Sequence, residues 1–258
     1  MSSHATQSID GTARTDEVLR LENVTKRFGG VVAVDDLSFS VREEEILGFI
    51  GPNGAGKSTT FNCVSGAFPP TDGAIYYRDE DVTGVPQYAL VEKGLARTYQ
   101  TFRPLEDRSV LENVSLSMVP NELFSFDEFR TTVEDRAREI CQQVGLSEHM
   151  HQTPDELPHA GLLRLEVGRA IGTEPDLLLV DEPFAGLTPE EVERTAALFR
   201  SLREDGMTLI VIDHNMHGLL DLVDRVVVIS FGEKIAEGSP EEIRNDPTVQ
   251  EAYLGGEL

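Results

Sequence analysis

The sequence predicts an α/β fold with a mostly parallel sheet and a helical segment inserted in its middle. Short β-branched runs alternate with helix-compatible segments, as strands and crossover helices do in such a sheet. Residues 46–50 are apolar throughout, as expected of a strand covered on both faces. Between about residues 100 and 173, helix formers and acidic residues dominate instead.

The individual elements follow from the same patterns. Strands are expected at residues 18–24, 37–41, 46–50, 73–78, 177–180, 208–212, 226–230 and 234–237. A helix is expected at 57–65, because Gly66 and two prolines soon after it stop further helix. A second helix is expected at 189–205, where the pattern is amphipathic.

The chain of 258 residues is expected to form a flexible polar tail at 1–16 and one domain at 17–258. A helical subdomain, at about 100–173, is expected as an insertion in the core of this domain. No uninterrupted apolar stretch of about 18 residues is present, and residues 1–16 lack the apolar centre of a secretory signal. The protein is therefore expected in the cytosol.

The charge is strongly acidic, with 46 acidic and 22 basic residues and a formal charge of −24. Such a surface repels nucleic-acid phosphates, so DNA and RNA are not expected partners. The two cysteines, Cys63 and Cys141, are too few for a disulfide framework or a metal cluster and are expected to be buried.

A glycine-rich segment follows the apolar strand at 46–50. It begins at Gly51, reads Gly-Pro-Asn-Gly-Ala-Gly-Lys-Ser and matches the P-loop pattern. Backbone N–H groups in such a loop face phosphate oxygens, and the helix N-terminus adds about half a positive charge. Lys57 would neutralise the β- and γ-phosphates of ATP, and the Ser58 hydroxyl would ligate Mg²⁺. The predicted nucleotide-binding residues here are Gly51, Pro52, Asn53, Gly54, Ala55, Gly56, Lys57, Ser58 and Thr59.

Carboxylates and a histidine follow two later strands. The strand at 177–180 ends in Asp181 and Glu182, and His214 follows the strand at 208–212. Together with a P-loop, Asp181 is expected to coordinate Mg²⁺ and Glu182 to polarise the attacking water. His214, at the same edge of the sheet, is a candidate sensor of the γ-phosphate.

The chain resembles the ABC ATPases. Besides the P-loop, the family's order and spacing are matched by Phe28-Gly-Gly, Arg97-Thr-Tyr-Gln, Asp181-Glu-Pro and Asp213-His, and the likeness runs from residue 19 to 254. The resemblance implies a P-loop NTPase with a mixed or parallel sheet core, an N-terminal antiparallel β subdomain and an inserted helical subdomain.

Other residues point to the ATP-binding subunits of branched-chain amino acid transporters. The supporting runs are Phe61-Asn-Cys, Gly94-Leu-Ala-Arg-Thr-Tyr-Gln, Ala185-Gly-Leu-Thr-Pro and Glu251-Ala-Tyr-Leu-Gly.

The resemblance also implies residue roles. Phe28 would stack on adenine, and Gln100 would sense Mg²⁺ and couple to the membrane subunit, which residues 101–113 would face. The implied catalytic residues are Glu182, His214, Lys57 and Gln100. The implied metal ligands are Ser58, Gln100 and Asp181.

The implied function is an ATP-binding and ATP-hydrolysing subunit of an importer of branched-chain amino acids. It would lie at the cytoplasmic face of the cell membrane and pair with a second ABC ATPase subunit and two transmembrane permeases. A substrate-binding protein would act with it indirectly.

Two segments depart from the family pattern. The signature, usually Leu-Ser-Gly-Gly-Gln, is Leu157-Pro-His-Ala-Gly here, and Thr188 replaces the usual aspartate after the catalytic glutamate. Both segments belong to the family's dimer interface. The departures favour a heterodimer in which the partner supplies an intact signature.

Three alternatives remain. The cargo could be another compound, such as urea or a lipid. The chain could instead sense ATP and hydrolyse it weakly, which the altered signature favours and Glu182 and His214 oppose. A soluble ABC protein of translation or repair usually carries two cassettes or a long coiled-coil insertion, and neither is present in this sequence.

The acidic composition favours a host with high internal salt over an ordinary acidic protein. Repulsion among surface acids is screened within about 3 Å in 1 M salt. The melting temperature, measured by calorimetry, is therefore expected to rise between low and molar KCl. A melting temperature that stays constant or falls over this range contradicts the high-salt interpretation.

Overall fold

The computed structural model describes residues 16–99, 103–118 and 126–254. Its largest sheet has the strand order β10-β9-β3-β8-β7-β6. The strands are β3 (Ile46–Ile50), β6 (Leu95–Arg97), β7 (Leu177–Asp181), β8 (Thr208–Ile212), β9 (Arg225–Ser230) and β10 (Glu233–Gly238). All neighbours pair in parallel except β9 and β10. β3 and β8 are buried along their whole length, which explains their continuous apolar sequences.

A second, antiparallel sheet has the order β2-β1-β4-β5. Its strands are β1 (Glu17–Phe28), β2 (Val31–Arg42), β4 (Asp72–Tyr77) and β5 (Glu80–Asp81). β1 and β2 extend further than the apolar pattern predicts. Register shifts between them allow pairing to continue where the alternation of apolar and polar residues breaks down.

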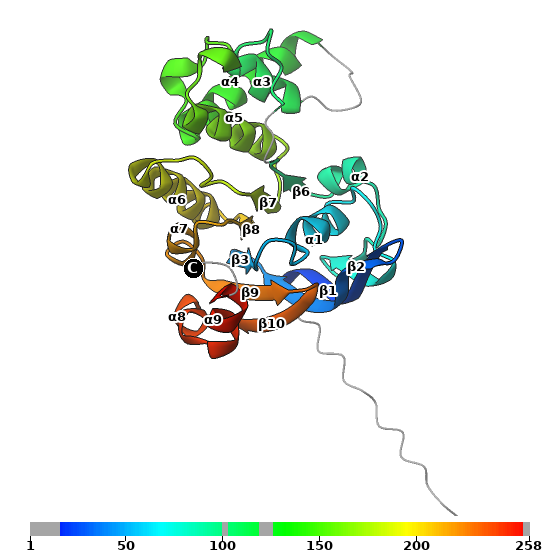
Figure 1. Ribbon diagram of the computed structural model, residues 1–258. Helices are drawn as coiled ribbons and strands as arrows, with labels where there is room; N and C mark the ends of the chain where they lie inside the picture. Colours follow the sequence, from blue (N-terminus) through cyan, green and yellow to red (C-terminus); the bar gives the residue numbers. More distant parts are fainter. Residues whose placement is uncertain (1–15, 100–102, 119–125, 255–258) are drawn as a thin grey trace, which may run out of the picture.

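Three helices, α3 (Val110–Ser117), α4 (Phe126–Gln143) and α5 (His159–Ile171), form a separate group at one end of the molecule (Figure 1). Two 3₁₀ turns, η1 (Ser147–His149) and η2 (Pro154–Glu156), connect α4 to α5. The other helices are α1 (Lys57–Val64), α2 (Gln87–Glu92), α6 (Pro189–Glu204), α7 (Met216–Leu220), α8 (Pro240–Asn245) and α9 (Pro247–Leu254).

Two hydrophobic cores lie on opposite faces of the parallel sheet. Successive residues of β7 illustrate the division: Leu178 and Val180 join a core shared with α3, α5 and α6, whereas Leu177 and Leu179 join one shared with the antiparallel sheet and α1. This alternation follows the two-residue period of a strand. The sheet is thereby fixed from both sides, and its loops project from a rigid support.

The fold class predicted from the sequence is confirmed. The strands expected at 46–50 and 208–212 have the predicted bounds. Cys63 and Cys141 are buried, and burial raises the pKa of each thiol to about 11. The tail at 1–15 lies outside the described residues. Within the described residues, each helix is too short or too polar to cross a lipid bilayer.

Candidate nucleotide site

The P-loop connects β3 to α1, and close backbone contacts on both sides fix its path. A Cβ atom on Gly51 would lie 2.2 Å from the carbonyl oxygen of Ile229, and one on Gly56 would lie 2.4 Å from that of Ala33. Gly56 also has φ of 106°, which disfavours other residues. The loop therefore fits only because Gly51 and Gly56 have no side chains.

Lys57 is 7% exposed and folds back over the loop that precedes it. Its Nζ donates hydrogen bonds to the carbonyl oxygens of Gly51 at 2.6 Å and Pro52 at 3.1 Å. Burial lowers the pKa of Lys57, while the charges of Glu182 and Asp181 oppose this shift. The ammonium thus lies within electrostatic range of the two carboxylates at the end of β7. Beyond it on α1, Ser58 is exposed and Thr59 is half-buried.

Glu182 and His214 meet at the ends of β7 and β8. His214 Nε2 lies 3.0 Å from Glu182 Oε1. Glu182 has φ of 52°, a left-handed conformation that is unfavourable for a non-glycine residue, and its N–H donates to the carbonyl oxygen of Ile212 at 2.8 Å. Residues with unfavourable backbone conformations are found more often at functional sites, where the conformation fixes the direction of the side chain.

The neighbouring carboxylate, Asp181, is held by a residue to which the sequence pattern assigned no role. Arg97 Nη2 lies 2.8 Å from Asp181 Oδ2, and the two side chains are 5% and 11% exposed. The sequence does contain a signal for this pairing: Arg97 follows two apolar residues, and a charged side chain buried in this way needs a partner of opposite charge.

Asp213 lies under the loops that follow β7 and β8 and accepts hydrogen bonds from their backbone. It is buried, and desolvation raises its pKa despite hydrogen bonds donated by the backbone N–H groups of Asn215 and Phe184. The bond from Phe184 joins the loop after β7 to the loop after β8, and the bond from Asn215 lies within the second loop. Asp213 thereby helps to fix the relative positions of Glu182 and His214.

Phe28 lies at the end of β1 with 48% of its surface exposed. Its ring contacts Phe68 edge to face, with 5.4 Å between centroids, and Lys26 Nζ lies 5.1 Å from its centroid. A braced, half-exposed aromatic ring is suited to stack against a flat base.

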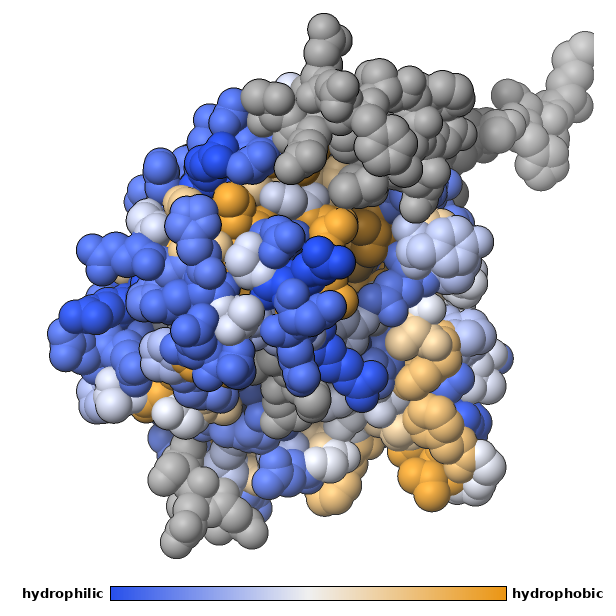
Figure 2. Space-filling model, turned by 90° about the horizontal axis from the view of Figure 1, so that it is seen from above, coloured by the Kyte–Doolittle hydropathy of each residue, from blue (hydrophilic) through white to orange (hydrophobic). Residues whose placement is uncertain are grey.

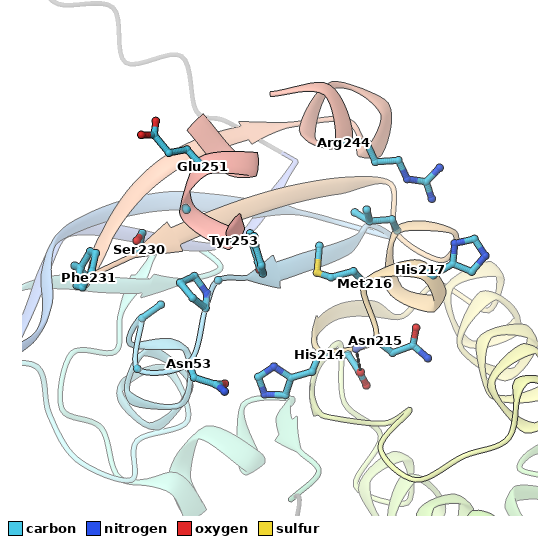
Figure 3. A pocket seen from close by; sticks show the side chains of 17 residues that line it. Asn53, His214, Asn215, Met216, His217, Ser230, Phe231, Arg244, Glu251 and Tyr253 are labelled. Atoms are coloured by element: carbon cyan, nitrogen blue, oxygen red, sulfur yellow. Dashed lines mark hydrogen bonds between the residues drawn. The ribbon is translucent and has the colours of Figure 1, made fainter. Parts of the chain in front are cut away.

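A cavity of about 1040 Å³ lies beside the P-loop. Figure 3 shows Asn53 of the P-loop and His214 across one end of it, with Tyr253 of α9 further inside. Burial raises the pKa of the Tyr253 hydroxyl, an effect opposed by a hydrogen bond from the Gly51 backbone. The C-terminal helix therefore contacts the first residue of the P-loop, which the sequence did not predict.

Comparisons with known proteins agree with this geometry. A family model described as "ABC transporter" matches residues 34–185. The chain is 37% identical to the high-affinity branched-chain amino acid transport ATP-binding protein LivG of Salmonella typhimurium, over 92% of this chain and 98% of that protein. The chain belongs to the ABC transporter family. It is an ATP-binding protein and an ATPase whose hydrolysis of ATP is coupled to transport.

Other relatives extend the match. The high-affinity branched-chain amino acid transport ATP-binding protein BraF of Pseudomonas aeruginosa is 35% identical over 92% of this chain and 98% of its own. A crystal structure of the ADP conformation of MJ1267, an ATP-binding cassette of an ABC transporter, has a TM-score of 0.84 and 31% identity, covering 93% of this chain and 99% of that one. A model described as "Branched-chain amino acid ATP-binding cassette transporter" matches residues 233–258.

The altered ABC signature lies where α5 begins. Pro158 is the N-cap residue, with no side-chain hydrogen bond to the helix, and His159 is the first helical residue. His159 Nε2 donates to the carbonyl oxygen of Ala185 at 3.1 Å. The histidine thus joins the signature segment to the loop after Glu182, a contact that the sequence did not predict.

Thr188, the other departure from the family pattern, caps α6. Its hydroxyl accepts from the Glu191 N–H, and its own N–H donates to the Glu191 carboxylate at 2.8 Å. Both hydrogen bonds stabilise the helix start. Gln100, the remaining predicted site residue, lies outside the described residues.

The P-loop geometry generates one prediction. Lys57→Ala is expected to remove a charge-assisted contact to the phosphates, and such a contact is worth about 1.5–3 kcal/mol. We expect ATP affinity, measured by titration calorimetry, to fall roughly ten- to a hundredfold. Lys93→Ala is the matched control, because Lys93 pairs with Glu80 on the surface. An affinity of Lys57→Ala within about twofold of the parent would contradict the placement of the P-loop.

Proposed function

We propose that this chain is the ATP-hydrolysing subunit of an importer of branched-chain amino acids. The observation that carries the catalytic part is the convergence of Lys57, Asp181 and the Glu182–His214 pair at one edge of the sheet. The similarity to LivG and BraF, together with the family model over 233–258, supports the cargo.

In the proposed mechanism, Lys57 leaves the carbonyl oxygens of its own loop and binds the β- and γ-phosphates. Glu182 then polarises the attacking water as a general base. His214, which contacts Glu182 at 3.0 Å, orients this carboxylate and senses the γ-phosphate. Phe28 supports the adenine ring.

The site is also suited to Mg²⁺. Among the described residues, no group of three or more histidine, cysteine or acidic side chains could enclose a metal ion. Mg²⁺ commonly binds one or two carboxylates together with substrate phosphates, and Asp181 with the nearby Ser58 hydroxyl fits this requirement. When bound, the ion would neutralise charge that develops on the phosphates.

The permeases would dock on the side of the helical group. Three large apolar side chains, Tyr99, Leu105 and Leu116, are exposed between 37% and 49% there. Tyr99 precedes the segment at 101–113 that the family pattern assigns to the membrane partner, Leu105 lies within it, and Leu116 follows it. Figure 2, which looks onto this end of the molecule, shows apolar areas within a mainly hydrophilic surface. We propose that the chain is attached through them to the cytoplasmic face of the membrane.

A second candidate function is ATP sensing with weak hydrolysis. Pro158 and His159 favour it, because neither supplies the hydroxyl or the close backbone approach that the usual signature offers to a partner's nucleotide. The ordered Glu182–His214 pair favours hydrolysis at this chain's own P-loop. We therefore propose a heterodimer with one fast and one slow site.

Catalysis and cargo can be tested together. Glu182→Gln keeps the side-chain shape but removes the base, so ATP should bind normally while turnover falls about a hundredfold or more. In liposomes with its permeases and binding protein, ATP hydrolysis and leucine uptake should fall together. Equal turnover in variant and parent excludes Glu182 as the base. Uptake of urea or a lipid without leucine uptake contradicts the cargo.

The altered signature leads to a further prediction. The loss of one donor to a developing charge costs about 2.7–4 kcal/mol of transition-state stabilisation, so the isolated chain should be a poor ATPase. Restoring the family pattern with Pro158→Ser, His159→Gly, Ala160→Gly and Gly161→Gln should raise its turnover in molar salt.

The matched control is Pro86→Ser. Pro86 is also an N-cap residue without a side-chain hydrogen bond, at the start of α2. Its replacement by serine therefore adds a capping hydroxyl to a helix outside the signature segment. Turnover of this control should equal that of the parent. If the parent hydrolyses ATP as fast alone as with its partner, the asymmetric-site proposal is wrong.

A further inference from the structure

Arg97 joins three elements of the nucleotide site. It is the last residue of β6, the strand that precedes the segment containing Gln100. Its Nη2 contacts Asp181 at the end of β7 at 2.8 Å. Its Nη1 donates to Asn62 Oδ1 at 2.7 Å and to Ser65 Oγ at 3.1 Å, on and just after the P-loop helix α1.

The guanidinium is enclosed on its remaining sides. Its carbon lies 5.5 Å from the ring centre of Phe61 and 5.1 Å from that of Tyr99. Among the described residues, Nε of Arg97 is the buried side-chain nitrogen or oxygen without a hydrogen-bond partner. A buried arginine that leaves one donor unsatisfied is costly, so its other contacts must offset this cost.

The contacts fix Asp181 without enclosing it. Arg97 contacts only the Oδ2 oxygen of this carboxylate. The Asp181 N–H donates to the hydroxyl of Thr98, the buried neighbour of Arg97, at 3.3 Å. The side chain of Asp181 is thus held by Arg97 at the end of β6 and its backbone by Thr98 just after that strand, and the second carboxylate oxygen remains for another ligand.

We propose that Arg97 is a positioning residue for the divalent cation that accompanies ATP. It holds Asp181 at a fixed place relative to α1, the helix that also carries Ser58. A cation brought in with the nucleotide then meets the hydroxyl and the carboxylate already in place. The inference rests on the proposed role of Asp181 in binding Mg²⁺.

A structural ion pair elsewhere provides a control for general destabilisation. Arg225 is also largely buried and pairs with Glu45 and Glu237. Its partners lie outside the nucleotide site. Arg225→Met should lower the melting temperature but leave the effect of Mg²⁺ on nucleotide binding unchanged.

The test measures the affinity of a non-hydrolysable ATP analogue by titration calorimetry, once with Mg²⁺ and once with EDTA. For Arg97→Met, we expect affinity in EDTA within about twofold of the parent and a loss of about tenfold or more in Mg²⁺, as for other partners of metal ligands. Arg97→Lys, which keeps the charge but not the fork, should lose less. Asn62→Ala should shift affinity in the same direction by a smaller factor.

The outcomes separate this inference from the proposed function. Asp181→Asn should abolish the effect of Mg²⁺ on affinity. If it does not, the assignment of Asp181 as a metal ligand fails. If it does, but both Arg97 variants respond to Mg²⁺ as the parent does, only the role of Arg97 fails. Equal losses with and without Mg²⁺ would reduce Arg97 to a structural support, and Arg97→Lys keeps this comparison available should Arg97→Met not fold.

Discussion

The site depends on the parallel pairing of β7, β8 and β3. Asp181 pairs with Ile212, and Gly48 with Val211, so the residues that follow these strands emerge at a single edge. Carboxylates from two strands and the lysine of a third loop thereby come within range of each other. A slip of register by one residue would turn each strand's buried side chains toward the opposite face.

That convergence creates electrostatic repulsion, which the structure reduces in a different way for each carboxylate. Asp181, Glu182 and Asp213 would repel one another if left unpaired. Arg97 neutralises the first, His214 contacts the second, and burial raises the pKa of the third. Lys57 adds a further positive charge nearby, held on the P-loop carbonyl oxygens. ATP would exchange those carbonyl contacts for phosphate contacts and leave the other pairs in place.

Sequence patterns predicted the elements that are defined by a short motif or by the periodicity of their own residues. The buried strands β3 and β8, the P-loop and the helix α6 could all be read directly, because each depends on its own residues. The strand β6 was not predicted, since three residues give too short a pattern. Nor were α7 and α8, although the Asn215 cap and the capping box of Ser239 and Glu242 are signals that could have found them.

Contacts between segments far apart in the sequence could not be predicted from these local patterns. Arg97 and Asp181 are far apart in the chain, as are His159 and Ala185, and only the folded topology pairs them. The same holds for Tyr253 and Gly51. One belongs to a segment matched by a branched-chain-specific family model, and the other to a segment matched by the general ABC model. A segment typical of the whole ABC family and a segment typical of its branched-chain amino acid members are thus joined by a hydrogen bond. Chimaeras that exchange C-terminal segments between relatives must therefore preserve this tyrosine, or they will disturb a P-loop whose own sequence is unchanged.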